Sequence, residues 1–336
     1  MAKVLVSLVG NQAINNIRFI KEFKQSTDVF VFISTTEMEA ENKTTAILNA
    51  LDIAGEKVKK VIVSSYKFDE IEDALNKTNF SQNDDYLINI TGGTKPMSIG
   101  VITHFLKYTK AKMFYVPIGE GTYRQVHPRI EKPETGFEKY TTLKEYLESY
   151  NLKVIEKESR VSRNIRHAED LMKDFISYNG DVNKIEKIRK ASGMSFPEDR
   201  SYYSGRWFEE YVFSKIKGKF KLNENQIAYG VQLLNDKAKN EYDAVFIYND
   251  TIYIVECKAY FGKSNLREKV GKDLYKLGAL DDDFGLKATS IYITTADIKG
   301  YNQNENNSLQ NRADALKVKF FQQEDLVNDS FLEEIK

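Results

Sequence analysis

Five short apolar runs rich in β-branched residues, separated by stretches with helical spacing, constrain the fold of this chain more than any other feature. They cover residues 4–9, 29–33, 58–63, 86–90 and 113–116. Strands that are apolar along their whole length and alternate with helices are typical of a parallel sheet covered on both faces. The sequence therefore predicts a doubly wound α/β domain, in which ligands bind beyond the carboxyl ends of the strands.

The loop after the fourth predicted strand has the composition of an anion-binding turn. Gly92 and Gly93 let backbone amides come close to a ligand, and Thr94 can cap the helix that follows. Lys95 adds a positive charge at the same end of that helix. The glycine spacing is not that of a P-loop, which disfavours nucleoside triphosphate hydrolysis. The alternative interpretation of this loop is a tight structural turn.

Two further loops reach the same edge of the predicted sheet. Asn11 and Gln12 follow the first strand, and Thr35 and Thr36 follow the second. Because ligands of such sheets bind beyond the carboxyl ends of the strands, these polar residues are candidate ligand contacts. The alternative for each pair is structural, namely the capping of a loop or of the next helix.

The length of the chain and a change of pattern near residue 150 indicate two domains. A chain of 336 residues exceeds the usual size of a single core. Residues 1–150 form the first domain, which ends in a hairpin-like stretch and a helix, and residues 151–200 form a mildly basic helical connector. Residues 201–336 combine one helix, a cluster of strands and then alternating helices and strands. We therefore expect a second α/β domain there.

The composition excludes several classes of protein. Lys and Arg (49) balance Asp and Glu (49), so no global basic field marks a DNA-coating protein. Cys257 is the single cysteine and only three histidines occur, which excludes an internal disulfide framework and a four-cysteine zinc site. No stretch approaches the ~18 apolar residues that a membrane span needs. We expect a cytoplasmic protein with no membrane partner.

The most informative segment of the second domain is a predicted hairpin around Asn249 and Asp250, a pair suited to a two-residue turn between β-rich runs. With those two residues as the loop, Asp243 pairs with Glu256 across the strands. Lys258 lies on the same face as Glu256, two residues further along. Both faces of the hairpin are otherwise apolar, so we expect it to be central and buried.

Two carboxylates and an ammonium group on an apolar face are costly unless their charge is compensated. A divalent cation between Asp243 and Glu256 would compensate it, and Mg²⁺ or Mn²⁺ prefers such hard oxygen ligands. Phosphodiester hydrolysis suits this arrangement, because the cation would activate water while Lys258 orients it or stabilises the transition state. The alternative is an ion pair in which Lys258 only neutralises Glu256.

Asp243, Glu256 and Lys258 match the motif of the PD-(D/E)xK nuclease superfamily, which they resemble in spacing as well as in type. The helix before them resembles the Gly-x-x-Phe-Glu helix of restriction-endonuclease-like proteins, in which the glutamate can add a metal ligand. Glu209 fits that spacing, and Glu210 remains an alternative. The resemblance implies a catalytic set of Asp243, Glu256, Lys258 and Glu209, of which the three carboxylates are the metal ligands.

The order of the two halves resembles the CARF-domain PD-(D/E)xK nucleases of type III CRISPR systems, the cyclic-oligoadenylate-activated ancillary nucleases. This resemblance implies an N-terminal Rossmann-like CARF domain with a parallel sheet and a C-terminal restriction-endonuclease-like α/β domain. It also implies a homodimer that binds cyclic tetra-adenylate and then cleaves single-stranded RNA or DNA, or nicks supercoiled DNA, in antiviral defence. By the family pattern the ring contacts are Asn11, Gln12, Thr35, Thr36, Gly92, Gly93, Thr94 and Lys95.

Two other functions remain open from the sequence. One is a cyclic-nucleotide sensor whose C-terminal domain has lost activity and only docks nucleic acid or a partner. The other is a restriction enzyme whose first domain recognises a duplex sequence, which an open parallel sheet without a groove-reading helix makes the weaker choice. A cleavage assay with Mn²⁺, with and without cyclic oligoadenylates, separates an active nuclease from an inactive sensor.

Overall fold

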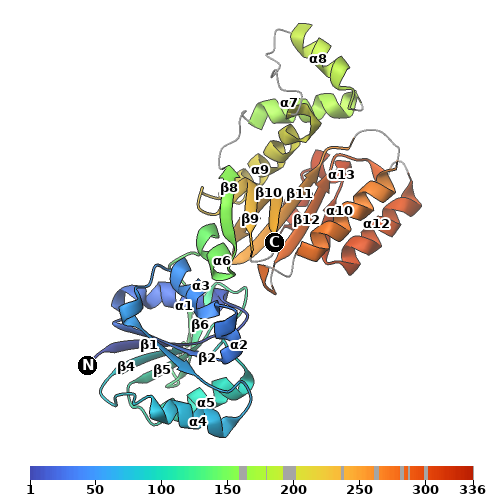
Figure 1. Cartoon of the computed structure of the whole chain (residues 1–336). Helices are drawn as coiled ribbons and strands as arrows, with labels where there is room; N and C mark the ends of the chain where they lie inside the picture. Colours follow the sequence, from blue (N-terminus) through green and yellow to red (C-terminus); the bar gives the residue numbers. More distant parts are fainter. Residues whose placement is uncertain are drawn as a thin grey trace.

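The computed structural model of the chain shows two α/β domains, each built on one sheet (Figure 1). The structure describes residues 1–158, 165–178, 180–191, 202–235, 238–260, 265–280, 284–286, 288–298 and 302–335. Within these ranges no helix is both long and apolar enough to cross a lipid bilayer.

Seven strands form the first sheet, in the order β3-β2-β1-β4-β5-β6-β7. Their bounds are β1 (Lys3–Leu8), β2 (Val29–Ser34), β3 (Val58–Ile62), β4 (Asp85–Asn89), β5 (Ala111–Tyr115), β6 (Thr122–His127) and β7 (Glu134–Gly136). The first five run parallel, and β6 and β7 add an antiparallel hairpin at the edge. The predicted parallel sheet and the hairpin-like stretch after it are confirmed.

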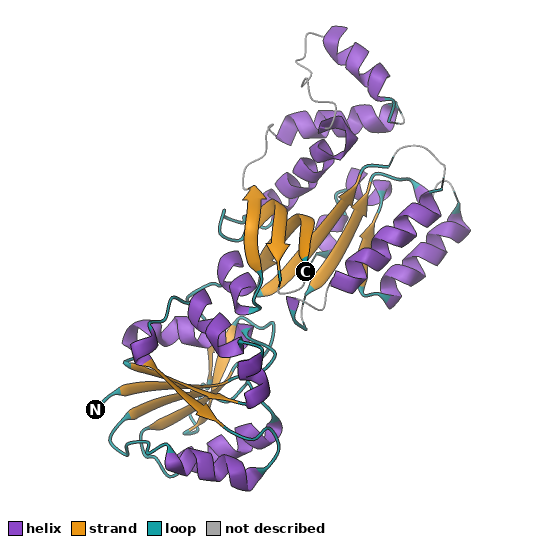
Figure 2. Cartoon of the chain, in the orientation of Figure 1, coloured by secondary structure: helices purple, strands orange, loops and turns teal. Residues whose placement is uncertain are grey.

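Helices cover both faces of this sheet because its strands are apolar on both sides (Figure 2). In β1, Leu5 packs in the core on one face while Val4 and Val6 pack in the core on the other. The helices are α1 (Ile14–Phe23), α2 (Thr36–Ala40), α3 (Lys43–Ala50), α4 (Phe68–Lys77) and α5 (Lys95–Phe105), with the 3₁₀ turns η1 (Lys24–Ser26) and η2 (Gly55–Lys57). Helices α1 and α3 share the core of Leu5, and α4 and α5 share the core of Val4.

Six strands form the second sheet, in the order β13-β12-β11-β10-β9-β8. Their bounds are β8 (Lys153–Glu158), β9 (Ile227–Leu234), β10 (Lys239–Tyr248), β11 (Thr251–Lys258), β12 (Thr289–Thr294) and β13 (Val318–Phe321). Strands β11, β12 and β13 are parallel, whereas β8 to β11 are antiparallel. The hairpin β10–β11 is central and buried, as predicted.

The helices of the second domain divide between the faces of its sheet (Figure 2). They are α7 (Ile165–Ser177), α8 (Val182–Ala191), α9 (Trp207–Lys219), α10 (Leu266–Leu280), α12 (Gln303–Ala315), α13 (Gln323–Val327) and α14 (Phe331–Glu334), with a π-helical turn, η3 (Tyr202–Arg206), before α9. Helices α7 and α9 share one core with the sheet, and α10 and α12 share another.

The segment expected to be a helical connector begins instead with a strand. Lys153–Glu158 forms β8 and pairs with β9 at the edge of the second sheet. Its charged side chains suit an edge strand, where they remain in solvent and discourage further pairing. Helices α7 and α8 follow as expected, and residues 159–164, 179 and 192–200 of the connector lie outside the described residues.

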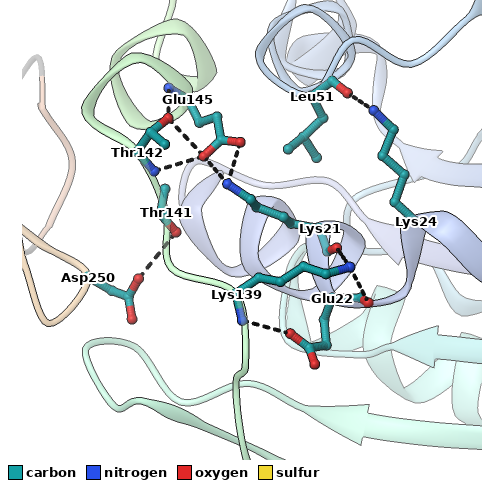
Figure 3. Close-up of polar contacts among 9 residues, drawn as sticks. All are labelled: Lys21, Glu22, Lys24, Leu51, Lys139, Thr141, Thr142, Glu145 and Asp250. Atoms are coloured by element: carbon teal, nitrogen blue, oxygen red, sulfur yellow. Dashed lines mark hydrogen bonds and ion pairs between the residues drawn. The ribbon is translucent and has the colours of Figure 1, made fainter. Parts of the chain in front are cut away.

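Helix α6 (Leu143–Ser149) lies at the junction of the domains (Figure 1). Its N-cap, Thr142, exchanges hydrogen bonds with Glu145, which also pairs with Lys21 of α1 at 2.5 Å (Figure 3). On the other side, Tyr146 Oη donates to Phe284 O at 2.8 Å. Both domains are therefore attached to the same short helix.

Candidate functional site

The turn of the β10–β11 hairpin has the geometry that its sequence predicts. Asn249 and Asp250 both have positive φ, 48° and 57°, as a two-residue type I′ turn requires. The register pairs Tyr248 with Thr251, and this alignment continues along the hairpin to Ala244 and Val255. Asp243 and Glu256 are the next residues along these two strands, and both carboxylates lie beside Lys258.

The three residues of the predicted catalytic motif meet at the open end of this hairpin. Lys258 Nζ lies 2.6 Å from Glu256 Oε1 and 3.6 Å from Asp243 Oδ2. The backbone N–H of Cys257 donates to Asp243 Oδ2 at 2.6 Å, which fixes the position of that carboxylate. The Asp243 and Glu256 side chains are largely buried, with 14% and 10% of their surface exposed. Two carboxylates and the ammonium group of Lys258 therefore lie close together.

Burial and like charge change how these groups hold protons. Burial, followed by the charge of Glu256, raises the pKa of Asp243 to about 8, although Lys258 opposes the shift. Burial alone would lower the pKa of Lys258, but the two carboxylates outweigh it, so the pKa of this ammonium group is raised. Ionisation of Asp243 beside Glu256 is therefore unfavourable with one lysine as counter-charge, and an additional cation at this position would favour the ionised form of Asp243.

The two glutamates at the start of α9 have different surroundings. Glu210 is 1% exposed and accepts hydrogen bonds from Tyr202 Oη at 3.3 Å and from Tyr229 Oη at 3.5 Å. Glu209 is half-buried; burial raises its pKa, while the charge of Lys258 opposes the shift. Glu209 therefore belongs to the electrostatic surroundings of Lys258, and Glu210 to a buried polar network.

Asp243 and Glu256 fit a hard divalent cation, because such a cation prefers carboxylate oxygens. An oxygen of each side chain lies close to Lys258 Nζ. Two carboxylates alone are a small ligand set. Over the described parts of the chain, no group of three or more His, Cys, Asp or Glu side chains is arranged to hold a metal ion. A third protein ligand, such as Glu209, would have to move closer when a cation binds.

A pair of tyrosines that share one aspartate lies next to this set and was not anticipated from the sequence. Asp273 of α10 accepts from Tyr260 Oη at 2.8 Å and from Tyr292 Oη at 2.9 Å. Tyr292 pairs with Glu256 across β11 and β12. Tyr260 follows the end of β11, two residues after Lys258, and this closeness in the sequence was the available signal. This cluster fixes α10 against the end of the sheet that carries Glu256 and Lys258.

A cavity of about 590 Å³ lies at the carboxyl ends of β1, β2 and β4 in the first domain. It occupies the switch point of the sheet, where the strand order reverses between β1 and β4. Six of the eight predicted ligand contacts line it, namely Asn11, Gln12, Thr35, Gly92, Gly93 and Thr94. The other two, Thr36 and Lys95, are exposed and do not line this cavity.

Close packing explains the two glycines of the loop. A Cβ at Gly92 would lie 2.0 Å from the carbonyl oxygen of Leu8, and Gly93 has a φ of +70°. Thr94 then caps α5 by accepting from the N–H of Met97. Thr35 likewise caps α2 by accepting from the N–H of Met38. Both threonines thus have a structural role and still face the cavity.

Asparagines that the sequence reasoning passed over support these loops. Asn16 Nδ2 donates to Leu8 O at 2.9 Å, and Asn89 Nδ2 donates to Asn16 Oδ1 at 3.0 Å. Asn15 also lines the cavity and is 2% exposed, yet its Oδ1 atom has no hydrogen-bond partner among the described residues. The available signal in the sequence was a pair of adjacent asparagines between the apolar residues Ile14 and Ile17. An unpaired acceptor beside a cavity is costly unless a ligand satisfies it.

Comparison with known proteins assigns a family to each half of the chain. Residues 4–146 match the family model of the Card1 CARF domain, and residues 197–329 match that of the Card1-like endonuclease domain. None of the curated proteins compared with the sequence gives a significant match.

Solved structures share the fold of the whole chain. Can2 from Sulfobacillus thermosulfidooxidans, solved in complex with cyclic tetra-adenylate, is 18% identical, with a TM-score of 0.73 and coverage of 95% of both chains. Protein VC1899 from Vibrio cholerae is 16% identical, with a TM-score of 0.75 and coverage of 98% of this chain and 97% of that one. A type III CRISPR defence DNA nuclease activated by cyclic oligoadenylate is 18% identical, with a TM-score of 0.60 and coverage of 88% of this chain but 45% of the nuclease.

Proposed function

We propose that this chain, which belongs to the Card1-like family of CARF-domain endonucleases, is a metal-dependent nuclease that cyclic oligoadenylate activates. The observation that carries the proposal is the presence of two chemically distinct sites in one chain. One is the carboxylate pair with Lys258 on the central hairpin. The other is the glycine-lined cavity at the switch point of the first sheet. The cA4 complex of Can2, which has the same fold, supports the choice of activator.

In the nuclease domain, Asp243 and Glu256 would hold Mg²⁺ or Mn²⁺, with Glu209 as a further ligand. When bound, such a cation activates water and stabilises charge on the scissile phosphate. The backbone N–H of Cys257 keeps the Asp243 carboxylate in place. Lys258 is paired with Glu256, and with another counter-charge at the carboxylates its ammonium group would be available to hydrogen-bond the phosphate.

In the first domain, we assign the ring contacts to the loops at the cavity. The backbone amides around Gly93 and the start of α5 would hold phosphate groups, because a helix N-terminus favours anions. Lys95 and Thr36 are exposed outside the cavity and would meet the parts of the ring that extend beyond it. A ring with two-fold symmetry, cyclic tetra-adenylate, suits a homodimer in which each CARF domain binds one half.

We extend the proposal to substrate and setting. The substrate is single-stranded RNA or DNA, with nicking of supercoiled DNA as a further activity, in type III CRISPR antiviral defence in the cytoplasm. The domain division is 1–150 for ligand sensing, 151–200 for the connector and 201–336 for the nuclease. A ring-sensing protein whose nuclease domain is inactive is the second candidate, because Lys258 already neutralises Glu256 at 2.6 Å.

One assay tests both candidates. The full-length protein is incubated with Mn²⁺ and single-stranded RNA, single-stranded DNA or supercoiled plasmid, with and without cyclic tetra-adenylate or rings of other sizes. We expect cleavage that needs both Mn²⁺ and the ring, and that Glu256→Gln abolishes while ring affinity is unchanged. Ring binding without cleavage of any substrate would favour the inactive sensor. Cleavage that Glu256→Gln leaves intact would reject this active site.

A further inference from the structure

The cavity of the first domain has one wall that comes from the second domain. Leu286, which lies between α10 and β12, lines the cavity together with Gln12 and Thr94. Its backbone N–H donates to Gln12 Oε1 at 3.2 Å. Tyr150 Oη donates to the same oxygen at 3.3 Å. Two donors at one atom fix the orientation of the Gln12 side chain, so a residue predicted to contact the ligand is also a contact between the domains.

The short segment 284–286 is attached to the first domain and α6 at each of its residues. The carbonyl oxygen of Phe284 accepts from Tyr146 Oη at 2.8 Å. Gly285 has a φ of +87° and lies so close to Tyr150 that a Cβ there would be 2.7 Å from the ring. Only glycine suits this position, since a side chain would collide with the tyrosine. The segment therefore approaches the cavity in a defined backbone conformation.

Leu286 itself is unusual, because this apolar residue is 79% exposed although its backbone N–H is hydrogen-bonded to Gln12. An apolar side chain fixed at the rim of a cavity gains from contact with a flat apolar surface. The same cavity contains Asn15, whose buried Oδ1 has no partner among the described residues. Leu286 and the Oδ1 atom of Asn15 therefore line the same cavity. A ligand with an aromatic face and polar hydrogens could pack against Leu286 and donate a hydrogen bond to Asn15.

We propose that the endonuclease domain takes part in ligand binding through Leu286, which packs against a base or sugar of the cyclic oligoadenylate in the cavity. This inference rests on the proposed function. It connects the ligand to the catalytic sheet by a short path, because β12 begins three residues after Leu286 and pairs with β11, which carries Glu256. Ring occupancy then favours one placement of the endonuclease domain, since only that placement supplies the wall.

The test measures the affinity of the full-length protein and its single-residue variants for the ring. Synthetic cyclic tetra-adenylate is titrated by calorimetry into wild type, Leu286→Ala, Leu286→Met and the matched control Leu106→Ala. Leu106 is also an exposed leucine, 53% accessible, but it does not line the cavity. We expect Leu286→Ala to raise the Kd about tenfold, the scale of losing a few buried methyl groups, whereas Leu286→Met and Leu106→Ala stay within about twofold of wild type. The Leu286→Ala variant should also need a correspondingly higher concentration of the ring for activation of its nuclease.

The outcomes separate the two proposals. If wild type does not bind cyclic tetra-adenylate or any other ring, the proposed function fails. If wild type binds and Leu286→Ala binds equally well, the endonuclease domain does not form the wall and this inference fails while the function stands. Because Leu286 is exposed, its substitution leaves the core intact, and an unchanged far-ultraviolet spectrum and unfolding midpoint confirm that lost affinity is not lost folding.

Discussion

The buried ion pair between Arg18 and Asp250 leads to the sharpest prediction about how the domains are held together. Arg18 of α1 is 2% exposed, and its Nη2 lies 2.8 Å from Asp250 Oδ2 in the turn of the β10–β11 hairpin. Burial lowers the pKa of Arg18 and raises the pKa of Asp250, and in each case the partner opposes the shift. The two groups thus depend on each other for their charged forms.

The substitution Asp250→Asn removes the charge and little else. Asparagine tolerates the positive φ of this position and can still accept from Thr141 Oγ1, which donates to Asp250 Oδ1 at 3.2 Å (Figure 3). It leaves the Arg18 guanidinium buried without a counter-charge, for which the typical cost is about 3–5 kcal/mol. The carbonyl of Glu120 and the ring of Phe137, 4.2 Å from the guanidinium, still contact it. We therefore expect the lower end, about 3 kcal/mol.

Urea unfolding of the metal-free full-length protein, followed by circular dichroism, measures this cost. The set is wild type, Asp250→Asn, Arg18→Met and the double variant, and the double variant should lose about 2 kcal/mol less stability than the two single losses add up to. Glu70→Gln is the matched control, because Glu70 forms an exposed ion pair with Lys67 and its loss should cost under about 0.5 kcal/mol. A cost below about 0.5 kcal/mol for Asp250→Asn, or additive single losses, would refute the reasoning.

Four further outcomes are expected. Lys258→Ala should lower the cleavage rate at least ~10²-fold with the ring affinity unchanged, measured by single-turnover cleavage and calorimetry. Lys95→Ala should weaken ring binding roughly ten- to a hundredfold, and an excess of ring should restore the cleavage rate. Because the pKa of Asp243 is about 8 in the folded protein and near 4 when unfolded, the free energy of unfolding should fall as pH rises from about 4 to 8, and Asp243→Asn should flatten that fall in urea titrations without metal. Glu209→Gln should raise the Mn²⁺ concentration needed for cleavage, whereas Glu210→Gln should mainly lower the unfolding midpoint; the reverse would make Glu210 the helical carboxylate of the site.

Short-range physics allowed the sequence to determine much of this protein. Apolar runs of strand length separated by helical spacing indicate a parallel sheet, because the helices that connect parallel strands cover both faces of the sheet. The pair Asn249-Asp250 adopts positive φ at both positions, and this fixes the register of the hairpin. From that register followed the meeting of Asp243, Glu256 and Lys258, which the structure contains.

Only the tertiary structure decided which residues far apart in the chain share a contact. The charged segment Lys153–Glu158 became an edge strand because β9 offered it a free edge, and nothing in its own pattern of residues required that partner. Leu286 lines the cavity and Asp250 pairs with Arg18 because α6 holds the two domains together at one junction. The sequence identified Asp250 as a turn residue and Gln12 as a loop residue, since turn chemistry acts over a few residues. Arg18, the ion-pair partner of Asp250, and Leu286, which donates to Gln12, lie more than 200 positions away from them in the sequence. At that separation, packing of the whole chain and not local preference sets the contact.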